Sequence, residues 1–280
     1  MREFFSSIAR RPPWGLRFLW RCWLSAVLRR LLRKEGVEHL VCYDIGARWG
    51  IWERFHRLPL PIFKVGFEAD PEEAERLLKS KAFDVVIPSA LSAGGGRKTL
   101  HLARDPGSSS IYGPDLALIA QHCDPRNFAV VREILLETIT LQSAVDTFKI
   151  PAPDFIKLDV EGAELEILKG AGDLLDNCSG VFFEARLAAF YHGEPLFGVV
   201  ASELLRRGFS LASFEPVGNF QGAIMLVDAG ACRNLHLENR RQYLLKTAAF
   251  ALLADNFEFA LACLRKVASK NEILFGFLTD

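Results

Sequence analysis

A short glycine turn follows an apolar run near residue 45, and its residue types can hold a nucleotide. The run Leu40-Val41-Cys42-Tyr43-Asp44-Ile45 is typical of a buried strand, and Gly46-Ala47-Arg48-Trp49-Gly50 follows it. Glycine permits the turn and lets the backbone approach a ligand closely. Only two glycines are present, so the three-glycine fingerprint of dinucleotide sites is absent. Such a turn also occurs simply to join a strand to a helix, and the motif alone does not decide between the two.

A carboxylate at the end of the second apolar run strengthens the nucleotide interpretation. Glu68 follows the run at residues 63–67 and stands 24 residues after Asp44. At that place a carboxylate can accept hydrogen bonds from both hydroxyls of a ribose. The alternative is a solvated acid ahead of a helix, with Asp70 as the N-cap of a helix that begins at Pro71. The glycine turn and the acid together favour the ribose role, which fits an adenosyl or a nicotinamide ligand.

Two acids that are two residues apart, Asp159 and Glu161, follow the apolar run that begins at residue 155. If the strand continues through both, their side chains lie on one face, where they can act as general base and positioning group for a hydroxyl acceptor. They can also hold a divalent cation, but the sequence identifies no third ligand, so the question of a metal stays open. Glu161 equally fits a role in starting the next helix, and for Glu164 we favour that structural role.

A second group of polar residues is expected at the same edge of the sheet. Glu184 ends the fifth strand, and Arg186, Tyr191 and His192 follow it in a loop. This loop is a candidate wall for the acceptor. His192 is a candidate general base, although an exposed loop histidine is the commoner case. The rest of the acceptor pocket carries no motif that constrains its chemistry.

Strands and helices alternate along the middle of the chain, which predicts a doubly wound α/β fold with a mainly parallel sheet. The expected strands cover residues 40–45, 63–68, 85–91, 155–160, 181–184, 209–214 and 223–227, and the expected helices cover residues 71–79, 162–175 and 196–207. The carboxyl ends of parallel strands share one edge of the sheet, where nucleotides bind. The segment 94–138 breaks this rhythm and is expected to be a surface excursion over the strand ends.

The order of these motifs resembles that of the FkbM family of methyltransferases. The family hallmark runs D-x-G-A-N-x-G, then F-E-P, A-L and S-S-L, and last K-x-D-V-E-G-A-E-x-x-V-L-x-G. The last motif is matched at Lys157, Asp159, Val160, Glu161, Gly162, Ala163, Glu164, Leu168 and Gly170. The resemblance covers about residues 40–230 and leaves both ends of the chain unexplained.

The resemblance implies a class I methyltransferase fold that binds S-adenosyl-L-methionine and usually methylates a hydroxyl oxygen of a sugar or polyketide-like substrate. The implied cofactor-binding residues are Asp44, Gly46, Ala47 and Gly50 at the methionine end, Glu68 at the ribose, Ser89, Ala90 and Leu91 near the adenine, and Asp159 facing the methyl group. We therefore expect an O-methyltransferase for a hydroxyl on a saccharide or related metabolite. The missing third glycine and the long motif argue against a nicotinamide oxidoreductase.

Two positions depart from the family pattern. Arg48 stands where asparagine is usual, and Ala69 and Asp70 separate Glu68 from Pro71. Arg48 can reach the carboxylate of the cofactor, or it can point to solvent and mark an altered site. The alternative to an enzyme is therefore a non-catalytic adapter that keeps the fold and binds a membrane or a partner through its helical ends.

The chain divides into a basic helical arm at residues 1–36, a methyltransferase domain at 37–232 and a helical extension at 233–280. Residues 1–34 of the arm hold nine basic residues and one acid, although the whole chain carries 34 residues of each sign. Apolar residues from 14 to 34 recur at helical spacing, which fits either a peripheral membrane helix or a helix docked on the protein's own core. The rest of the chain shows no matching basic footprint, so we expect no nucleic-acid partner. The extension is expected to pack on the main domain or to form a homodimer contact.

Six scattered cysteines form no metal-binding pattern and fit a reducing compartment. No stretch reaches the roughly 18 apolar residues of a membrane span, and the N-terminus lacks the features of a secretory signal. We expect a cytoplasmic protein, attached peripherally to the inner membrane surface if the arm binds lipid.

Overall fold

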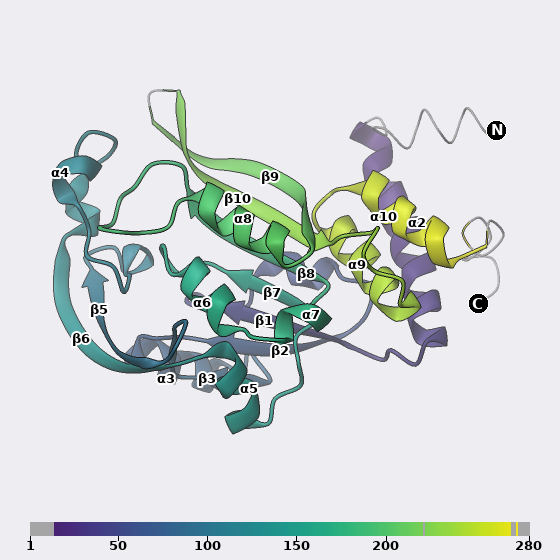
Figure 1. Cartoon of the computed structure of the whole chain (residues 1–280), viewed down its shortest axis with the longest axis horizontal. Coiled ribbons are helices and arrows are strands. Elements are labelled where there is room, and N and C mark those ends of the chain that lie inside the picture. The colour runs from purple at the N-terminus through teal and green to yellow at the C-terminus, as the bar shows by residue number, and fades with distance from the viewer. Residues whose placement is uncertain (1–13, 221, 270–272, 274–280) are drawn as a thin grey trace.

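The computed structural model describes residues 14–220, 222–269 and 273, and its centre is a seven-stranded sheet (Figure 1). The strands, in spatial order, are β3 (Val85–Ile87), β2 (Ile62–Phe67), β1 (Leu40–Ile45), β7 (Phe155–Leu158), β8 (Gly180–Arg186), β10 (Ala223–Arg233) and β9 (Phe209–Phe220). Neighbours from β3 to β8 run parallel, and β10 runs antiparallel to both β8 and β9. The expected α/β fold with a mainly parallel sheet is confirmed.

The strand order reverses between β1 and β7. From β1 the sheet is built outward through β2 to β3, and β7 and β8 are then added on the other side of β1. In open α/β sheets a ligand binds at this switch, beyond the carboxyl ends of the strands. In the sheet register, Asp44 of β1 lies beside Gly66 of β2 and Lys157 of β7. The glycine turn, Glu68 and Asp159 therefore meet at one edge.

Helices cover both faces of the sheet, because successive strand residues point to opposite faces. On one face, α5 (Leu141–Phe148), α6 (Glu164–Gly170), α7 (Leu174–Asn177) and α8 (Phe197–Arg206) join a core with Tyr43, Ile156 and Phe183. On the other, α2 (Trp14–Lys34), α9 (Arg241–Leu253) and α10 (Phe257–Val267) join a core with Cys42, Phe155 and Phe182. A further helix, α3 (Pro71–Ser80), connects β2 to β3.

The helices near the two ends of the chain lie side by side and share one core (Figure 1). The side chains of α2 that are at most 1% exposed are Leu24, Val27, Leu28, Leu31 and Leu32. Phe250 of α9 lies so close to β8 that a Cβ on Gly180 would be 2.1 Å from its ring. On the outer side of α2, Phe18 is 71% exposed. None of the described helices has both the length and the apolar character needed to cross a bilayer.

The segment expected to be a surface excursion contains most of a second sheet, in the order β4 (Ala90–Leu91), β6 (Val130–Ile139) and β5 (Gly96–Ala103). Between β5 and β6 lie the 3₁₀ helices η2 (Pro106–Ser108) and η3 (Pro125–Phe128) and the short helix α4 (Leu116–Ile119). The prediction of one strand over residues 85–91 is wrong, because the chain leaves the large sheet after Ile87 and enters the small one at Ala90. Pro88 lies between them and has no N–H to donate to a ladder.

Several other boundaries differ from the expected ones. The helix expected over residues 162–175 is divided into α6 and α7 around Gly172, which has a φ of +54°. The strand expected to reach residue 160 ends at Leu158, and β9 and β10 extend well beyond residues 214 and 227. The glycine turn is followed by the short 3₁₀ helix η1 (Glu53–Arg57).

Candidate active site

The glycine turn after β1 touches the loop after β7. Gly46 has a φ of +81°, and a Cβ on it would lie 1.8 Å from the carbonyl oxygen of Asp159. The backbone N–H groups of Gly46 and Ala47 both donate to the carbonyl oxygen of Phe67, at 3.1 and 3.0 Å. Only glycine permits this approach, because any side chain would displace the neighbouring loop. The turn is therefore fixed between the ends of β2 and β7.

Lys157 joins two acids behind this turn. Its Nζ lies 3.0 Å from Oδ1 of Asp44 and 3.3 Å from Oδ2 of Asp159, and it donates to the carbonyl oxygen of Gly46 at 3.0 Å. Burial opposes the charge of Lys157, but the two acids more than offset it and hold its pKa above the ordinary value. Asp44 is fully buried, and burial raises its pKa against the opposing effects of Lys157 and the Trp52 N–H. Asp44 therefore holds the glycine turn in place through its contacts with Lys157 and with the N–H of Trp52.

Glu68 lies just beyond β2 and is only 6% exposed. Its Oε1 accepts the backbone N–H of Asp70 at 2.9 Å, and Arg48 Nη2 lies 3.8 Å from the same oxygen. Burial raises the pKa of Glu68, and the hydrogen bond from Asp70 and the charge of Arg48 oppose the rise. Asp70 caps α3 by accepting the N–H of Glu72, and it also pairs with Arg48 at 2.8 Å. Arg48 is thus directed toward these two acids, and Glu68 is not a solvated acid.

A cavity opens at this edge of the sheet, between the loops after β1, β2 and β7 and the 106–111 segment of the insertion. The expected site residues that line it are Gly46, Glu68, Ser89, Ala90, Leu91, Asp159 and Glu161. Asp44, Ala47, Gly50 and His192 stand outside this lining. Trp49, for which no role was expected, lines the cavity with a largely exposed side chain.

Glu161 is held by groups from two other segments. Its carboxylate accepts hydrogen bonds from the guanidinium of Arg186 and from the Tyr191 hydroxyl, the latter at 3.1 Å. Its backbone carbonyl accepts the Ser110 hydroxyl at 2.6 Å. Burial raises the pKa of Glu161, and the charge of Arg186 opposes the rise. These contacts suit a positioning group, because Glu161 connects the loop after β7 to β8 through its carboxylate and to the insertion through its backbone carbonyl.

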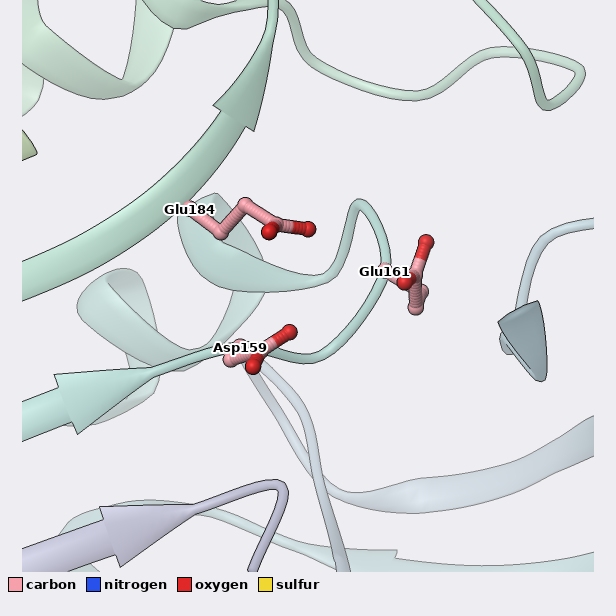
Figure 2. Close-up of side chains that lie close together, drawn as sticks. All are labelled: Asp159, Glu161 and Glu184. Atoms are coloured by element: carbon pink, nitrogen blue, oxygen red, sulfur yellow. The ribbon is translucent and has the colours of Figure 1, made fainter. Parts of the chain in front are cut away.

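The assumption that β7 continues through Asp159 and Glu161 is wrong, because β7 ends at Leu158 and Glu161 has a φ of +55°. The two side chains nevertheless converge with Glu184 of β8 (Figure 2). Each of the three acids offers a carboxylate oxygen within 4.8 Å of the others, so Glu184 supplies the third acidic group that the sequence did not identify. Three carboxylate oxygens at this spacing can hold a divalent cation.

Glu184 differs in protonation from an ordinary glutamate. Burial and the charges of Asp159 and Glu161 raise its pKa to about 9. Its carboxyl group therefore keeps its proton at neutral pH when no cation is bound. In that state Glu184 can donate a hydrogen bond and does not serve as a base.

Two residues of the nearby segments have simpler roles. The side chain of His192 is 69% exposed, and its Nδ1 lies 3.8 Å from Oδ2 of Asp115. Glu164 is buried, and its Oε1 accepts the backbone N–H groups of Val160 and Gly162. The structural role expected for Glu164 is thus seen directly, whereas His192 lies away from the cavity lining.

A second cavity adjoins the first on the far side of Asp159. Its walls include Asp159 and Glu184, which the sequence indicated as site candidates. They also include Trp52, Lys157, Phe182 and Asp228, for which no role was expected. Lys157 could have been expected near the site, because it belongs to the long motif that also contains Asp159. Asp228 could not, because the last strand was expected to end before it.

The sheet order and its switch between β1 and β7 define a doubly wound α/β fold of the class I methyltransferase type, with a cavity at the switch bordered by a glycine turn and a buried acid. The chain belongs to the family described as the methyltransferase FkbM domain, whose model matches residues 44–211.

Among characterised proteins, the chain is similar to a hexuronic acid methyltransferase of Haloferax volcanii, with 29% identity over 157 residues. This match covers 55% of the chain and 59% of the relative, so the chain matches little more than half of that protein's length. Solved structures with a similar course include the magnesium protoporphyrin IX methyltransferase of Synechocystis PCC 6803 with bound SAM (12% identity, TM-score 0.37, covering 76% of this chain and 79% of that one). A putative RNA methyltransferase of Pyrococcus horikoshii gives 12% identity and a TM-score of 0.35, covering 75% and 82%.

Proposed function

We propose that this chain transfers a methyl group from S-adenosyl-L-methionine to a hydroxyl oxygen of a saccharide. The observation that carries the proposal is the convergence of Gly46, Glu68 and Asp159 on one cavity at the switch between β1 and β7, in a chain of the FkbM family. The saccharide is supported by the similarity to a hexuronic acid methyltransferase.

The residues around the cavity fit an adenosyl ligand. Gly46 lines the cavity, and the charged methionine group of the ligand would lie against its turn. Glu68 offers a buried carboxylate, which can accept hydrogen bonds from both ribose hydroxyls. Ala90 and Leu91 add apolar surface where an adenine would lie.

The bound cofactor supplies a methyl group activated by a positively charged sulfur. The chain has to align the acceptor and take up its proton. We assign proton acceptance to Asp159, whose carboxylate is 42% exposed and is held by Lys157 at 3.3 Å. Glu161 is engaged by Arg186 and keeps its loop in place, and Glu184 carries its own proton at neutral pH. Asp159 is therefore the acid best placed to act as base.

Calorimetric titration with S-adenosylmethionine, S-adenosylhomocysteine and NAD tests the proposal. We expect the first two to bind and NAD not to bind. Glu68→Ala should abolish this binding, whereas Glu75→Ala, which removes an exposed acid of α3, should leave it intact. Failure of both adenosyl compounds to bind the wild-type chain would contradict the proposal and support the adapter. The adapter is not favoured at present, because Arg48 pairs with Asp70 while Glu68 and Asp159 line the cavity.

A peripheral contact of residues 14–34 with an anionic membrane is a further part of the proposal. The buried leucines of α2 contact the protein's own core, but Phe18, Cys22, Arg29 and Arg33 are exposed and share one side at 100° per residue. Such contact would place the protein at the inner membrane surface. Co-sedimentation with anionic vesicles should exceed that with neutral vesicles and should fall in Phe18→Ser. Equal soluble fractions with both kinds of vesicle would refute the contact.

A further inference from the structure

The second cavity lies where an acceptor of the proposed reaction would have to lie. It is lined by Trp52, Asp159, Phe182, Glu184 and Asp228, and Asp159 also lines the cavity assigned to the cofactor. A methyl acceptor has to contact both the methyl group and the base that takes its proton. Asp159 is the residue that the two cavities share, so the second cavity is the acceptor subsite if the proposed function holds.

The cations around this subsite already have acidic partners. Lys157 is paired with Asp44 and Asp159, as described above. Arg54, close to Trp52, makes two hydrogen bonds to the carboxylate of Glu215, at 3.2 and 2.6 Å. Among the described residues that line the subsite, the acids outnumber the single lysine by three to one.

The acids of the subsite also act on one another. Burial and the charge of Asp159 raise the pKa of Asp228, as they do for Glu184. Both shifts show that the surroundings disfavour added negative charge. A carboxylate on the acceptor would add one more negative charge among these acids, with no free lysine or arginine in the lining to receive it.

We infer that the cavity between Trp52, Asp159, Glu184 and Asp228 takes a saccharide unit without negative charge and that the methylated atom is a hydroxyl oxygen. This sets the chain apart from a relative named for hexuronic acid. Carboxyl and carboxylate groups can hydrogen-bond to sugar hydroxyls, and Trp52 and Phe182, whose rings are 4.6 Å apart, add apolar surface.

The chemistry balances with the groups present. The hydroxyl oxygen forms a bond to the methyl carbon while the carbon–sulfur bond breaks, and that bond's electron pair stays on the sulfur. The hydroxyl proton passes to the Asp159 carboxylate. A carboxylate acceptor has no proton to lose and would need no base, so a base at this position serves a hydroxyl acceptor.

Matched pairs of aryl glycosides test the inference. Wild-type protein with labelled S-adenosylmethionine is given aryl glucoside, galactoside and mannoside, each beside its uronide, with and without added magnesium. We expect kcat/KM for at least one neutral glycoside to exceed that of its uronide by at least about tenfold. Asp228→Asn should narrow this ratio, because it removes a source of negative charge, whereas Glu184→Gln should change it little, because Glu184 already carries a proton at neutral pH. Glu133→Gln, on the exposed strand β6, should leave the ratio unchanged.

Other results of this experiment would contradict either the inference or the proposed function. A preference for the uronide, with or without magnesium, would overturn the inference, as would a base-labile methyl ester as the product. If no glycoside is methylated and none binds in calorimetry with saturating S-adenosylhomocysteine, the inference fails while cofactor binding stands. If S-adenosylhomocysteine itself does not bind, the proposed function fails with it.

Discussion

The carbonyl oxygen of Asp159 occupies the space that a side chain on Gly46 would need, since a Cβ there would lie 1.8 Å from it. Gly46 follows β1 and Asp159 follows β7, so this contact closes the switch point of the sheet. Lys157 links the same two segments, because it pairs with Asp44 at the end of β1 and with Asp159 in the loop after β7. The turn proposed to bind the cofactor and the proposed base are thus held together by direct contacts.

Cofactor affinity should depend on pH through Glu68. Burial raises the pKa of Glu68, and only the ionised form can accept hydrogen bonds from both ribose hydroxyls. The Kd for S-adenosylhomocysteine should stay constant above this pKa and rise as the pH falls through it. The rise should begin at a higher pH than the ordinary glutamate value of about 4.3 implies. Calorimetry across a pH series measures this.

Two variants check the assignment to Glu68. Glu68→Gln should bind more weakly and lose this pH dependence. Arg48→Ala should move the dependence to higher pH, because Arg48 opposes the rise in the pKa of Glu68. An unchanged pH profile in both variants would show that another group titrates.

Removal of the Glu161 carboxylate should destabilise the fold. Arg186 has a side chain only 7% exposed, and Glu161→Ala would leave its charge with the more distant Glu194 at 3.6 Å. Loss of one partner of a buried pair costs about 3–5 kcal/mol of unfolding free energy. Urea denaturation measures the loss. Arg206→Ala breaks an ion pair whose arginine is 67% exposed and should cost less than about 1 kcal/mol. Equal effects would argue against a buried network.

The protonation of Glu184 predicts how stability varies with pH. Its pKa is about 9 in the folded protein, so between the ordinary value and pH 9 the folded state binds more protons than the unfolded state. The free energy of unfolding should therefore fall as the pH rises through this range. Glu184→Gln should remove this part of the decline and be more stable than wild type at pH 8 by at least about 1 kcal/mol. The exposed control Glu75→Gln should follow the wild-type curve; a Glu184→Gln curve that did the same would contradict the raised pKa.

The helical extension should be essential for stability. Phe250 of α9 packs on Gly180 and within 4.5 Å, centroid to centroid, of the Phe182 ring. Truncation of a buried phenylalanine costs about 3–5 kcal/mol, so Phe250→Ala should lower the urea midpoint strongly. Val199→Ala, on the exposed side of α8, should change the unfolding free energy by less than about 0.5 kcal/mol. A small effect of Phe250→Ala would mean that α9 is dispensable.

Local patterns were sufficient to predict the main elements of the sheet. The apolar runs predicted β1 at residues 40–45 and the core of β2, and the extension expected to be helical contains α9 and α10. The small sheet was not predicted. Its strands β5 and β6 pair across an intervening segment of more than 25 residues, and no local period reports such a pairing.

In the candidate site, too, some positions could be predicted from the sequence and others could not. Gly46, Glu68 and Asp159 follow apolar strands directly, so strand order alone brings them to one edge. The contact between Glu161 and Arg186 and the position of Asp228 beside Glu184 depend on where strands end and on which neighbours they choose. The ends and the neighbours of the strands are determined by packing across the whole sheet, and a local sequence pattern carries no information about that packing.

The binding of S-adenosylhomocysteine to Gly46→Ala is the most direct test of the central claim, that the contact between the loops after β1 and β7 forms the cofactor site. A methyl group at Gly46 would push the turn away from Asp159, whereas Gly198→Ala adds one in open space on α8. Calorimetry should show tight binding to the wild type and to Gly198→Ala, and a loss of at least about a hundredfold in affinity for Gly46→Ala. Binding by Gly46→Ala as tight as that of the wild type would contradict the account.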